Sequence, residues 1–265
     1  MNISLNNFIN KIKPFFFKRK QQYSVIMILS ENKTKKSEFR IFAHRGASGR
    51  MPENTLPAIE KAISYGAKWI EIDIQFSDGE IFVFHDERLE RLTDGEGFFK
   101  EKSIEYLRSL NAGNGGKIPY LREVLEISKK KLCINIEIKD DDAVIPLNDE
   151  LKKQIDAGKF LPENFIISSY FIKHIELFRS LNSIMPCAII TDYADKSIIY
   201  KSETLDCRSV HINISGVNRN FVEVCHSKNV KVYVFTVDTE KELNEMKEMN
   251  VDGIFTDFPD LFILS

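Results

Sequence analysis

The sequence contains little cysteine, and the cysteines it has do not suggest a disulfide framework. Its 265 residues include four cysteines, which lie at wide spacings without a recurring pattern. Small secreted domains that depend on disulfides instead place their cysteines densely. Three of the four lie in apolar, strand-like surroundings, so we expect buried free thiols in a reducing cytoplasm. The four residues are Cys133, Cys187, Cys207 and Cys225.

Long apolar runs are also lacking near the N-terminus. The longest there covers only the five residues 25–29. A membrane-spanning helix needs about 18 apolar residues, and the apolar region of a signal peptide is also longer than this run. We therefore expect neither a transmembrane segment nor a secretion signal.

Charge of one sign is not in excess over the whole chain. Lys and Arg number 37 and Asp and Glu 39, which gives a net charge of −2 at pH 7. Nucleic-acid-binding proteins usually carry an excess of positive charge, so we expect no nucleic-acid partner. Hydrophobic residues make up 43% and charged residues 29% of the chain, which argues against wholesale disorder.

The N-terminal residues differ from the rest in charge. Residues 1–40 hold nine Lys or Arg and two acidic residues, and aromatic and basic residues are interleaved over residues 8–20. This pattern is typical of peripheral contact with an anionic membrane surface, although Pro14 would interrupt a helix there. A disordered tail, or an upstream start codon ahead of Met27, are the alternatives. We expect residues 1–38 to form a basic, Phe-rich extension and residues 39–265 a folded domain, cytoplasmic or peripheral at the inner membrane surface.

After residue 38, short apolar runs alternate with segments of helical periodicity. The candidate strands are residues 39–43, 69–75, 132–138, 165–168, 185–190, 209–214, 230–237 and 253–256, and the helical patterns include residues 55–65, 121–129, 148–157, 172–181, 220–228 and 240–249. This alternation predicts an α/β protein with parallel strands closed into a (β/α)8 TIM barrel, with an open doubly wound sheet as the alternative. Residues 80–84 add a short strand outside the alternation. Residues 87–117 form a surface excursion after the second strand.

Polar side chains interrupt two of the most apolar strands. Glu71 and Asp73 alternate with isoleucines in the second strand, and Glu137 does so in the third, followed by Lys139. Because side chains alternate faces along a strand, we expect the isoleucines to pack under the outer helices. The polar side chains then point into the mouth of the barrel.

Three carboxylates that converge in a barrel would repel one another unless a positive charge lay among them. Oxygen ligands without Cys or paired His suit a hard divalent cation, Mg²⁺ or Ca²⁺, better than Zn²⁺. We therefore expect Glu71, Asp73 and Glu137 to bind such a cation. The alternative is a structural layer in which the three carboxylates pair with Arg45 and Lys139.

Two histidines follow directly on apolar strands and so lie at the same rim as the carboxylates. His44 and His85 could supply one general base and one general acid at neutral pH. Arg45 and Lys139 add fixed positive charge that suits an anionic phosphoryl oxygen. His174, His211 and His226 lack such neighbours. His211 lies near a strand end, however, and could line the mouth of the barrel.

These residues belong to a set of motifs that extends from about Phe39 to the C-terminus. The motifs are AHRGAS (43–48), PENT (52–55), IEID (70–73), DG (78–79), FHD (84–86), IPYL (118–121), NIEIK (135–139) and GIFTDFP (253–259). In this order and spacing they resemble the glycerophosphodiester phosphodiesterase family. The resemblance implies a (β/α)8 barrel, a divalent metal at Glu71, Asp73 and Glu137, acid and base histidines at His44 and His85, and substrate contacts at Arg45 and Lys139.

The chain departs from this pattern at one strand end. The family commonly has Trp-Thr-Val-Asn where this sequence has Phe235, Thr236, Val237 and Asp238. The aromatic wall is kept at Phe235, which we expect to contact substrate, but the indole is lost. Asn54, in the motif after the first strand, has either a site role or a turn role.

The resemblance implies metal-dependent hydrolysis of glycerophosphodiesters to glycerol 3-phosphate and an alcohol, in lipid and glycerol metabolism. One alternative is a lysophospholipase D that acts at a membrane surface. An alternative of another class is a catalytically silent phosphoester-binding module. The choice between Mg²⁺ and Ca²⁺, the preferred alcohol, the order of the two histidines and the oligomeric state remain open at this point.

Overall fold

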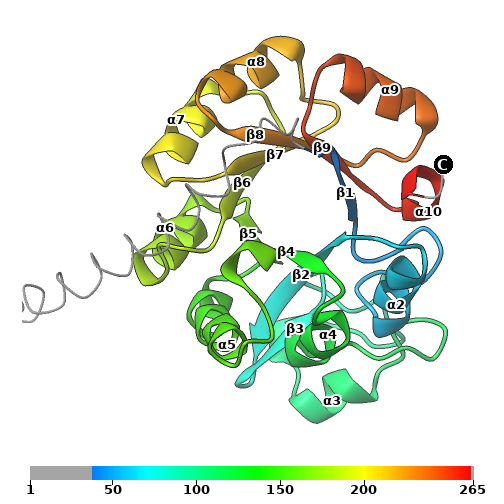
Figure 1. Ribbon diagram of the computed structural model, residues 1–265. Coiled ribbons are helices and arrows are strands. Elements are labelled where there is room, and N and C mark those ends of the chain that lie inside the picture. Colours follow the sequence, from blue (N-terminus) through cyan, green and yellow to red (C-terminus); the bar gives the residue numbers. More distant parts are fainter. Residues whose placement is uncertain (1–37, 264–265) are drawn as a thin grey trace, which may run out of the picture. The chain divides into compact units, whose positions relative to one another are not determined.

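A computed structural model describes residues 38–263 of the chain. Nine strands form one sheet in the order β1-β9-β8-β7-β6-β5-β4-β2-β3, and β1 also pairs with β2. That last pairing closes the barrel, and the helices lie around its outside (Figure 1). All strand pairs of the barrel are parallel, whereas β3 lies outside it and pairs antiparallel with β2. The (β/α)8 barrel predicted from the sequence is confirmed.

The elements follow the predicted alternation closely. The strands are β1 (Arg40–Ala43), β2 (Trp69–Ser77), β3 (Glu80–Val83), β4 (Cys133–Ile138), β5 (Phe165–Ser169), β6 (Cys187–Thr191), β7 (Ser209–Asn213), β8 (Lys231–Phe235) and β9 (Gly253–Thr256). The α-helices are α2 (Leu56–Ser64), α3 (Ile104–Ser109), α4 (Leu121–Ser128), α5 (Val144–Asp156), α6 (Ile172–Leu181), α7 (Lys196–Thr204), α8 (Arg219–Ser227), α9 (Glu240–Glu248) and α10 (Pro259–Ile263). Short 3-10 turns lie at η1 (Phe99–Glu101), η2 (Asp141–Ala143) and η3 (Pro162–Asn164).

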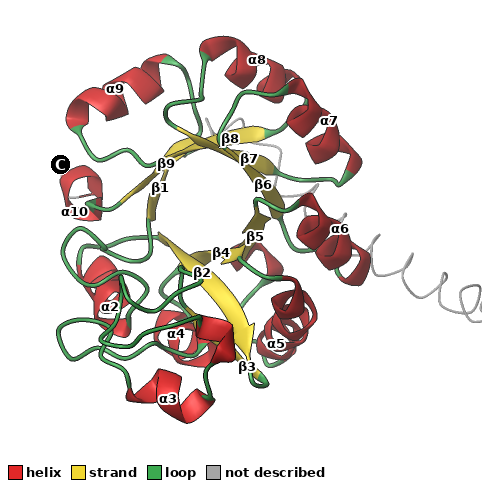
Figure 2. Ribbon diagram, turned by 180° about the vertical axis from the view of Figure 1, so that it is seen from behind, coloured by secondary structure: helices red, strands yellow, loops and turns green. Residues whose placement is uncertain are grey.

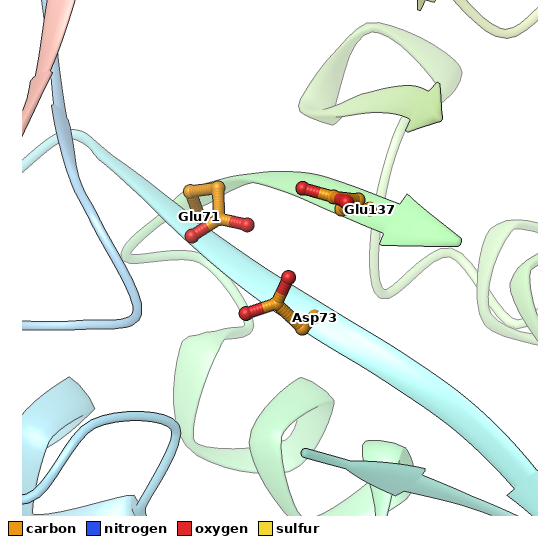
Figure 3. Close-up of side chains that lie close together, drawn as sticks. All are labelled: Glu71, Asp73 and Glu137. Atoms are coloured by element: carbon orange, nitrogen blue, oxygen red, sulfur yellow. The ribbon is translucent and has the colours of Figure 1, made fainter. Parts of the chain in front are cut away.

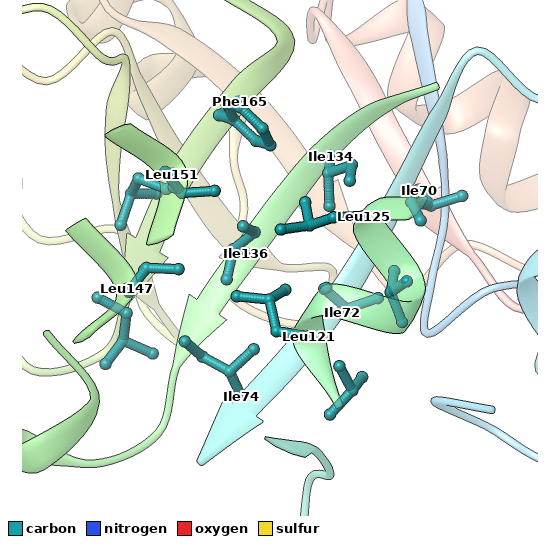
Figure 4. Close-up of a cluster of buried hydrophobic side chains, with 14 of the residues drawn as sticks. Ile70, Ile72, Ile74, Leu121, Leu125, Ile134, Ile136, Leu147, Leu151 and Phe165 are labelled. Atoms are coloured by element: carbon teal, nitrogen blue, oxygen red, sulfur yellow. The ribbon is translucent and has the colours of Figure 1, made fainter. Parts of the chain in front are cut away.

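The alternating isoleucines of β2 and β4 pack outward, as the sequence predicts. Ile70, Ile72 and Ile74 lie opposite Ile134, Ile136 and Ile138 in the parallel register, and all six are buried. Leucines of α4 and α5 cover them, so this part of the core lies between the barrel and its helices (Figure 4). Because side chains alternate faces, the register that places these isoleucines outside places Glu71, Asp73 and Glu137 inside.

Aromatic side chains fill the interior of the barrel below its mouth. Phe42 stacks on Phe255 with 4.5 Å between ring centroids, and it lies 5.3 Å from Trp69 and 5.0 Å from Tyr233. The guanidinium of Arg40 lies 4.5 Å from the centroid of the Trp69 ring. We call this group the aromatic layer. It packs the barrel interior, so the polar residues occupy the end where the strands finish.

Helix α5 begins earlier than the sequence pattern predicts. The pattern predicts a helix over residues 148–157, but α5 starts at Val144 and contains Pro146. The first four N–H groups of a helix have no partner within the helix, so a proline in the first turn removes no hydrogen bond. Proline near the start of a helix is therefore not a reliable stop signal.

The excursion after the second strand is more ordered than a surface loop. Residues 87–117 contain η1 and α3, and their side chains form a buried cluster together with residues of β3. Leu89, Phe99 and Leu107 of the excursion pack in this cluster with Phe82 of β3. The excursion is thus a small packed addition beside β3.

The N-terminal extension predicted for residues 1–38, with its membrane contact over residues 8–20, lies almost wholly outside the described residues. Within residues 38–263, no helix is both long and apolar enough to cross a membrane.

Candidate active site

Three carboxylates meet at the mouth of the barrel. Glu71 and Asp73 project from β2 and Glu137 from β4, and they point toward one another (Figure 3). One oxygen from each lies within 4.8 Å of the other two. Glu71 and Asp73 are buried, and Glu137 is partly buried. The structure therefore brings together the three residues that the sequence suggested as metal ligands.

Two cationic side chains lie against this cluster. The Arg45 backbone N–H donates to Glu71 Oε2 at 2.9 Å, and Arg45 Nε lies 3.2 Å from Asp73 Oδ2. Lys139 Nζ donates to Glu137 Oε1 at 2.8 Å and lies 3.8 Å from Asp73 Oδ1. Both cations predicted from the sequence are thus in place beside the carboxylates.

The positive charges of Arg45 and Lys139 do not compensate all three carboxylates equally. Burial and the charge of Asp73 raise the pKa of Glu71 to about 8, and burial with the same charge raises the pKa of Glu137. Burial also disfavours ionised Asp73, but the charges of Arg45 and Lys139 outweigh it and lower the pKa of Asp73. The protein alone thus stabilises one carboxylate of the cluster and leaves the other two short of positive charge.

The cluster also has lone pairs without a partner. Among the described residues, Glu71 Oε1 and Asp73 Oδ1 are buried and accept no hydrogen bond. A buried carboxylate oxygen without a donor costs free energy unless something else satisfies it. Oxygen donors, an excess of negative charge and inward-facing free lone pairs are what a hard divalent cation requires. The residues present therefore fit such an ion.

Each of the two predicted histidines is held by an aspartate on its Nδ1 atom. His44 Nδ1 lies 2.7 Å from Asp257 Oδ1, and its Nε2 lies 4.0 Å from Glu71 Oε2. His85 Nδ1 lies 2.6 Å from Asp86 Oδ1. With Nδ1 occupied in both residues, Nε2 is the atom left for proton transfer.

The surroundings shift the two histidines in opposite directions. Burial would lower the pKa of His44, but the hydrogen bond with Asp257 and the charge of Glu71 outweigh it and raise that pKa. Burial dominates at His85 and lowers its pKa, against the charge of Asp73. The site therefore holds two imidazoles with different proton affinities, which suits a reaction that needs both an acid and a base.

Asn54 both contacts the site and takes a turn conformation, so each of the two readings that its motif left open has support. Its Nδ2 donates to Asp73 Oδ2 at 2.8 Å, and its Oδ1 accepts from the Asp73 backbone N–H at 3.2 Å. Asn54 takes a left-handed backbone conformation, with φ of 58°, which asparagine tolerates better than most residues. It fixes the orientation of the central carboxylate.

The remaining histidines lie outside the cluster. His211 is buried beside the aromatic layer, 4.9 Å from the Phe255 ring, and burial lowers its pKa to about 3. His174 bonds to Ser169 and Asp141, and His226 to Asp252. Phe235, the predicted substrate contact, ends β8 at the mouth, and its ring lies 6.4 Å from that of Phe255.

Asp86 and Asp257 lie within the FHD and GIFTDFP motifs, but the sequence pattern predicts no role for either. The signal that could have identified Asp257 is strand order. In the parallel register Ala43 lies opposite Thr256, so the next residue of each strand, His44 and Asp257, must also be neighbours. Asp86 simply follows His85 in the chain.

A model of the glycerophosphoryl diester phosphodiesterase family matches residues 44–261. The chain belongs to this family. It is 35% identical over 235 residues to a glycerophosphodiester phosphodiesterase of Bacillus altitudinis, an alignment that covers 83% of this chain and 95% of the relative. The corresponding enzyme of Caldanaerobacter subterraneus is 33% identical over 239 residues and covers 84% and 96% of the two chains.

A solved structure agrees with this assignment. The phosphodiesterase of Oleispira antarctica, determined in complex with the product sn-glycerol-3-phosphate, has a TM-score of 0.75 and 28% identity, and the match covers 84% of this chain and 94% of that one. The prediction of an enzyme of the glycerophosphodiester phosphodiesterase family is confirmed.

Proposed function

We propose that this enzyme hydrolyses glycerophosphodiesters to glycerol 3-phosphate and a free alcohol, with a divalent cation bound by Glu71, Asp73 and Glu137. The observation that carries the proposal is the carboxylate cluster with its unpartnered oxygens, placed between two aspartate-bound histidines and two cations. The product complex of the Oleispira antarctica relative supports the substrate class. Lipid and glycerol metabolism is the context in which such diesters arise.

Each side chain has a part in this reaction that follows from its position. Arg45 and Lys139 lie beside the carboxylates and would bind the non-bridging phosphoryl oxygens, where negative charge increases in the transition state. One of His44 and His85 would take a proton from the attacking oxygen through Nε2. The other would protonate the oxygen of the leaving alcohol. Asp257 and Asp86 keep both imidazoles oriented for these transfers.

The cation would be held by Glu71, Asp73 and Glu137, while Asn54 keeps Asp73 in place. Mg²⁺ and Ca²⁺ both accept oxygen ligands of this kind. When bound, such an ion supplies Lewis-acid polarisation of a phosphoryl oxygen. The chain itself contributes three converging carboxylates, and Asn54 fixes the orientation of the one on Asp73.

The proposed activity is tested by incubating the purified protein with glycerophosphocholine, with and without EDTA, and by following free choline and glycerol 3-phosphate. We expect both products in equal amounts, and loss of both in EDTA with recovery on addition of Mg²⁺ or Ca²⁺. Lysophosphatidylcholine serves as the second substrate. Preferential cleavage of lysophosphatidylcholine would favour a lysophospholipase D. No turnover of any diester would favour a silent binding module. The comparisons with known proteins favour neither alternative.

The metal site has its own test in Glu137→Gln. The variant keeps the shape of the side chain but removes one charge, so we expect weaker cation binding and loss of most activity. A cation that binds only the native state stabilises it by RT ln(1 + [L]/Kd), about 2.7 kcal/mol at 100 times Kd. Wild type should therefore melt at a higher temperature as Mg²⁺ or Ca²⁺ is titrated, and the variant should respond much less.

Glu60→Gln on the exposed face of α2 is the matched control. It removes the same charge far from the cluster and should keep the wild-type response to metal. If neither ion shifts the wild-type melting temperature and EDTA leaves activity intact, the carboxylates form a structural ionic layer instead.

We also propose a cytoplasmic location. Supporting it, all four cysteines are free thiols, and three of them are buried. Thiols of this kind persist in a reducing compartment. Peripheral contact of residues 8–20 with the inner membrane surface stays a prediction from the sequence.

A further inference from the structure

One half of the barrel mouth is formed by side chains that the proposed mechanism does not use. Side chains alternate faces along a strand, so a residue two or four positions after an interior-facing residue also faces the interior. Interior-facing residues of β5 to β8 include Ile166 of β5, Ala188 of β6 and Tyr233 of β8. The positions reached at the mouth are Tyr170, Asp192, Asn213 and Phe235, which come from or directly follow β5, β6, β7 and β8 respectively. We call these four residues the aromatic-carboxylate group.

Contacts among the four residues confirm that they form one surface. Tyr170 Oη donates to Asp192 Oδ1 at 3.1 Å, and Asn213 Nδ2 donates to the same oxygen at 3.4 Å. The Tyr170 and Phe235 rings meet edge to face, with 6.3 Å between their centroids and 82° between their planes. The Asp192 carboxylate thus accepts from the phenol of Tyr170, and the ring of that tyrosine packs against the ring of Phe235.

Asp192 has neutral partners only. Its side-chain hydrogen bonds come from a phenol and an amide, and none of the ion pairs described above within residues 38–263 includes it. Asp192 is partly buried, so part of its charge is shielded from water. A carboxylate in this setting retains a negative potential directed toward the mouth of the barrel.

The aromatic-carboxylate group is close to the reacting centre. Burial, followed by the charges of Asp192 and Glu137, raises the pKa of Tyr170. Tyr170 therefore remains a neutral hydrogen-bond donor. Ser168 lies opposite Glu137 in the parallel register of β4 and β5, so Tyr170, two positions further on the same face, follows at the carboxylate side of the mouth. The side chain is also 39% exposed, which leaves part of the ring free for contact.

The two halves of the mouth differ in charge. Arg45 and Lys139 lie on the side formed by β1, β2 and β4, where an anionic phosphate would bind. The half formed by β5 to β8 offers π faces and an unpaired carboxylate instead. Aromatic faces and a carboxylate together attract ammonium groups, and aromatic cages of this kind bind quaternary ammonium ligands elsewhere.

We propose that the aromatic-carboxylate group binds the leaving alcohol of the substrate when that alcohol carries a positive charge, as choline and ethanolamine do. The inference rests on the proposed hydrolysis of glycerophosphodiesters, which is what would bring an ammonium group to this end of the barrel. Phosphate and ammonium of one substrate would then lie against the basic and acidic halves of the mouth. The enzyme should accordingly prefer glycerophosphocholine to a diester with a neutral alcohol.

The test compares glycerophosphocholine with glycerophosphoglycerol in wild type and in Asp192→Asn. Asparagine has nearly the same size and can still accept the hydrogen bond from Tyr170, so only the charge is lost. We expect the ratio of kcat/KM for the choline diester to that for the glycerol diester to fall about five- to tenfold. Asp149→Asn on the exposed surface of α5 removes the same charge away from the mouth and should keep the wild-type ratio.

A pair of inhibitors separates charge from shape. Choline and 3,3-dimethylbutan-1-ol have nearly the same form, but only choline is a cation. Choline should inhibit wild type at a lower concentration than its neutral analogue, and this difference should shrink in Asp192→Asn and in Phe235→Leu. Lysophosphatidylcholine on vesicles tests whether a lipid headgroup is also accepted at this subsite; if it is, its cleavage should fall in Asp192→Asn by the same factor as that of glycerophosphocholine.

The outcomes separate the two proposals. If wild type cleaves none of the diesters, the proposed function is wrong. If wild type cleaves both diesters, but Asp192→Asn alters both by the same factor or choline inhibits no better than its analogue, the proposed function stands and the ammonium subsite is wrong.

Discussion

The two histidines at the mouth are each oriented by a neighbouring aspartate. Each has an aspartate on Nδ1, at 2.7 Å for His44 and 2.6 Å for His85. An acceptor on one ring nitrogen fixes both the tautomer and the orientation of the ring. The Nε2 atoms, to which we assign the proposed proton transfers, are thereby oriented without any contact from the substrate.

Replacing either histidine should therefore remove a proton-transfer group and leave the fold intact. We expect His85→Ala to lower kcat by about 10²- to 10⁴-fold, and His44→Ala to do likewise, the range of a positioned general acid or base. Steady-state kinetics with glycerophosphocholine measure this, and melting temperatures check the fold. His226→Gln, which changes a histidine bonded to Asp252 away from the mouth, should keep kcat. A histidine whose alanine variant retains more than about half of wild-type kcat takes no part in proton transfer.

Burial of Glu71 in the carboxylate cluster should make the stability of the protein depend on pH. Its pKa is raised from 4.5 in isolation to about 8 in the folded protein, so between these values the native state binds more protons than the unfolded state. Stability must then fall as pH rises through that window. We expect the melting temperature of the EDTA-treated protein to decrease from about pH 5 to about pH 8, with a smaller decrease in Glu71→Gln.

Thermal denaturation across this pH range checks the expectation. Glu60→Gln should follow the wild-type curve, because that side chain is exposed on α2. Parallel curves for wild type and Glu71→Gln would show that folding does not raise the pKa of Glu71.

At the scale of elements, the excursion over residues 87–117 reaches back to the site. Arg91 donates to both oxygens of Asp86 at 2.6 Å, and it also bonds to Glu53, which binds Arg45 at 2.6 Å. Asp86 in turn holds His85. One arginine of the excursion thus joins the segments after β1 and β3 above the carboxylate cluster, which explains why this addition lies at the rim.

Arg91 should consequently act as a positioning residue. Without its guanidinium Asp86 loses two charge-assisted hydrogen bonds and holds His85 less firmly, so we expect Arg91→Ala to lower kcat about tenfold, in the range found when residues that orient active-site groups are removed. The pH profile of kcat should also shift on the limb that reports His85, which a purely structural effect would not do. Arg88→Ala, in the same excursion and paired with Glu90, should change neither the rate nor the profile.

At the scale of the whole molecule, the barrel is complete without the first residues of the chain. All strands of the barrel lie between Arg40 and Thr256, and every residue placed in the site lies within that range or at Asp257. The described part of the chain thus contains the closed sheet, its helices and all the proposed chemistry.

Deleting residues 1–36 should therefore leave hydrolysis of a soluble glycerophosphodiester within about twofold of the full chain, since no barrel strand is lost. Activity assays on both forms measure this. Co-sedimentation with anionic liposomes tests the membrane role of residues 8–20, which should require the extension and weaken with salt. A truncated protein that folds but has lost its activity would show that the extension belongs to the catalytic domain.

The sequence by itself determined the barrel and most of the chemical groups in its mouth. The isoleucines of β2 and β4 fix which face of each strand is buried, because a period of two leaves no freedom in the side chains between them. Glu71, Asp73 and Glu137 had to face inward for the same reason. His44 and His85 were located because each directly follows a strand, and strand ends meet at one rim.

Only the tertiary structure decided how these groups are held. Asp257 reaches His44 across 213 positions because β9 closes against β1, and Arg91 reaches Asp86 and Glu53 through the packing of the excursion. Asp192 bonds to Tyr170 and Asn213, which belong to or follow other strands. The periodicity of a sequence reports the face on which a side chain lies, but partners from distant strands become neighbours only through closure of the sheet and the packing of its loops.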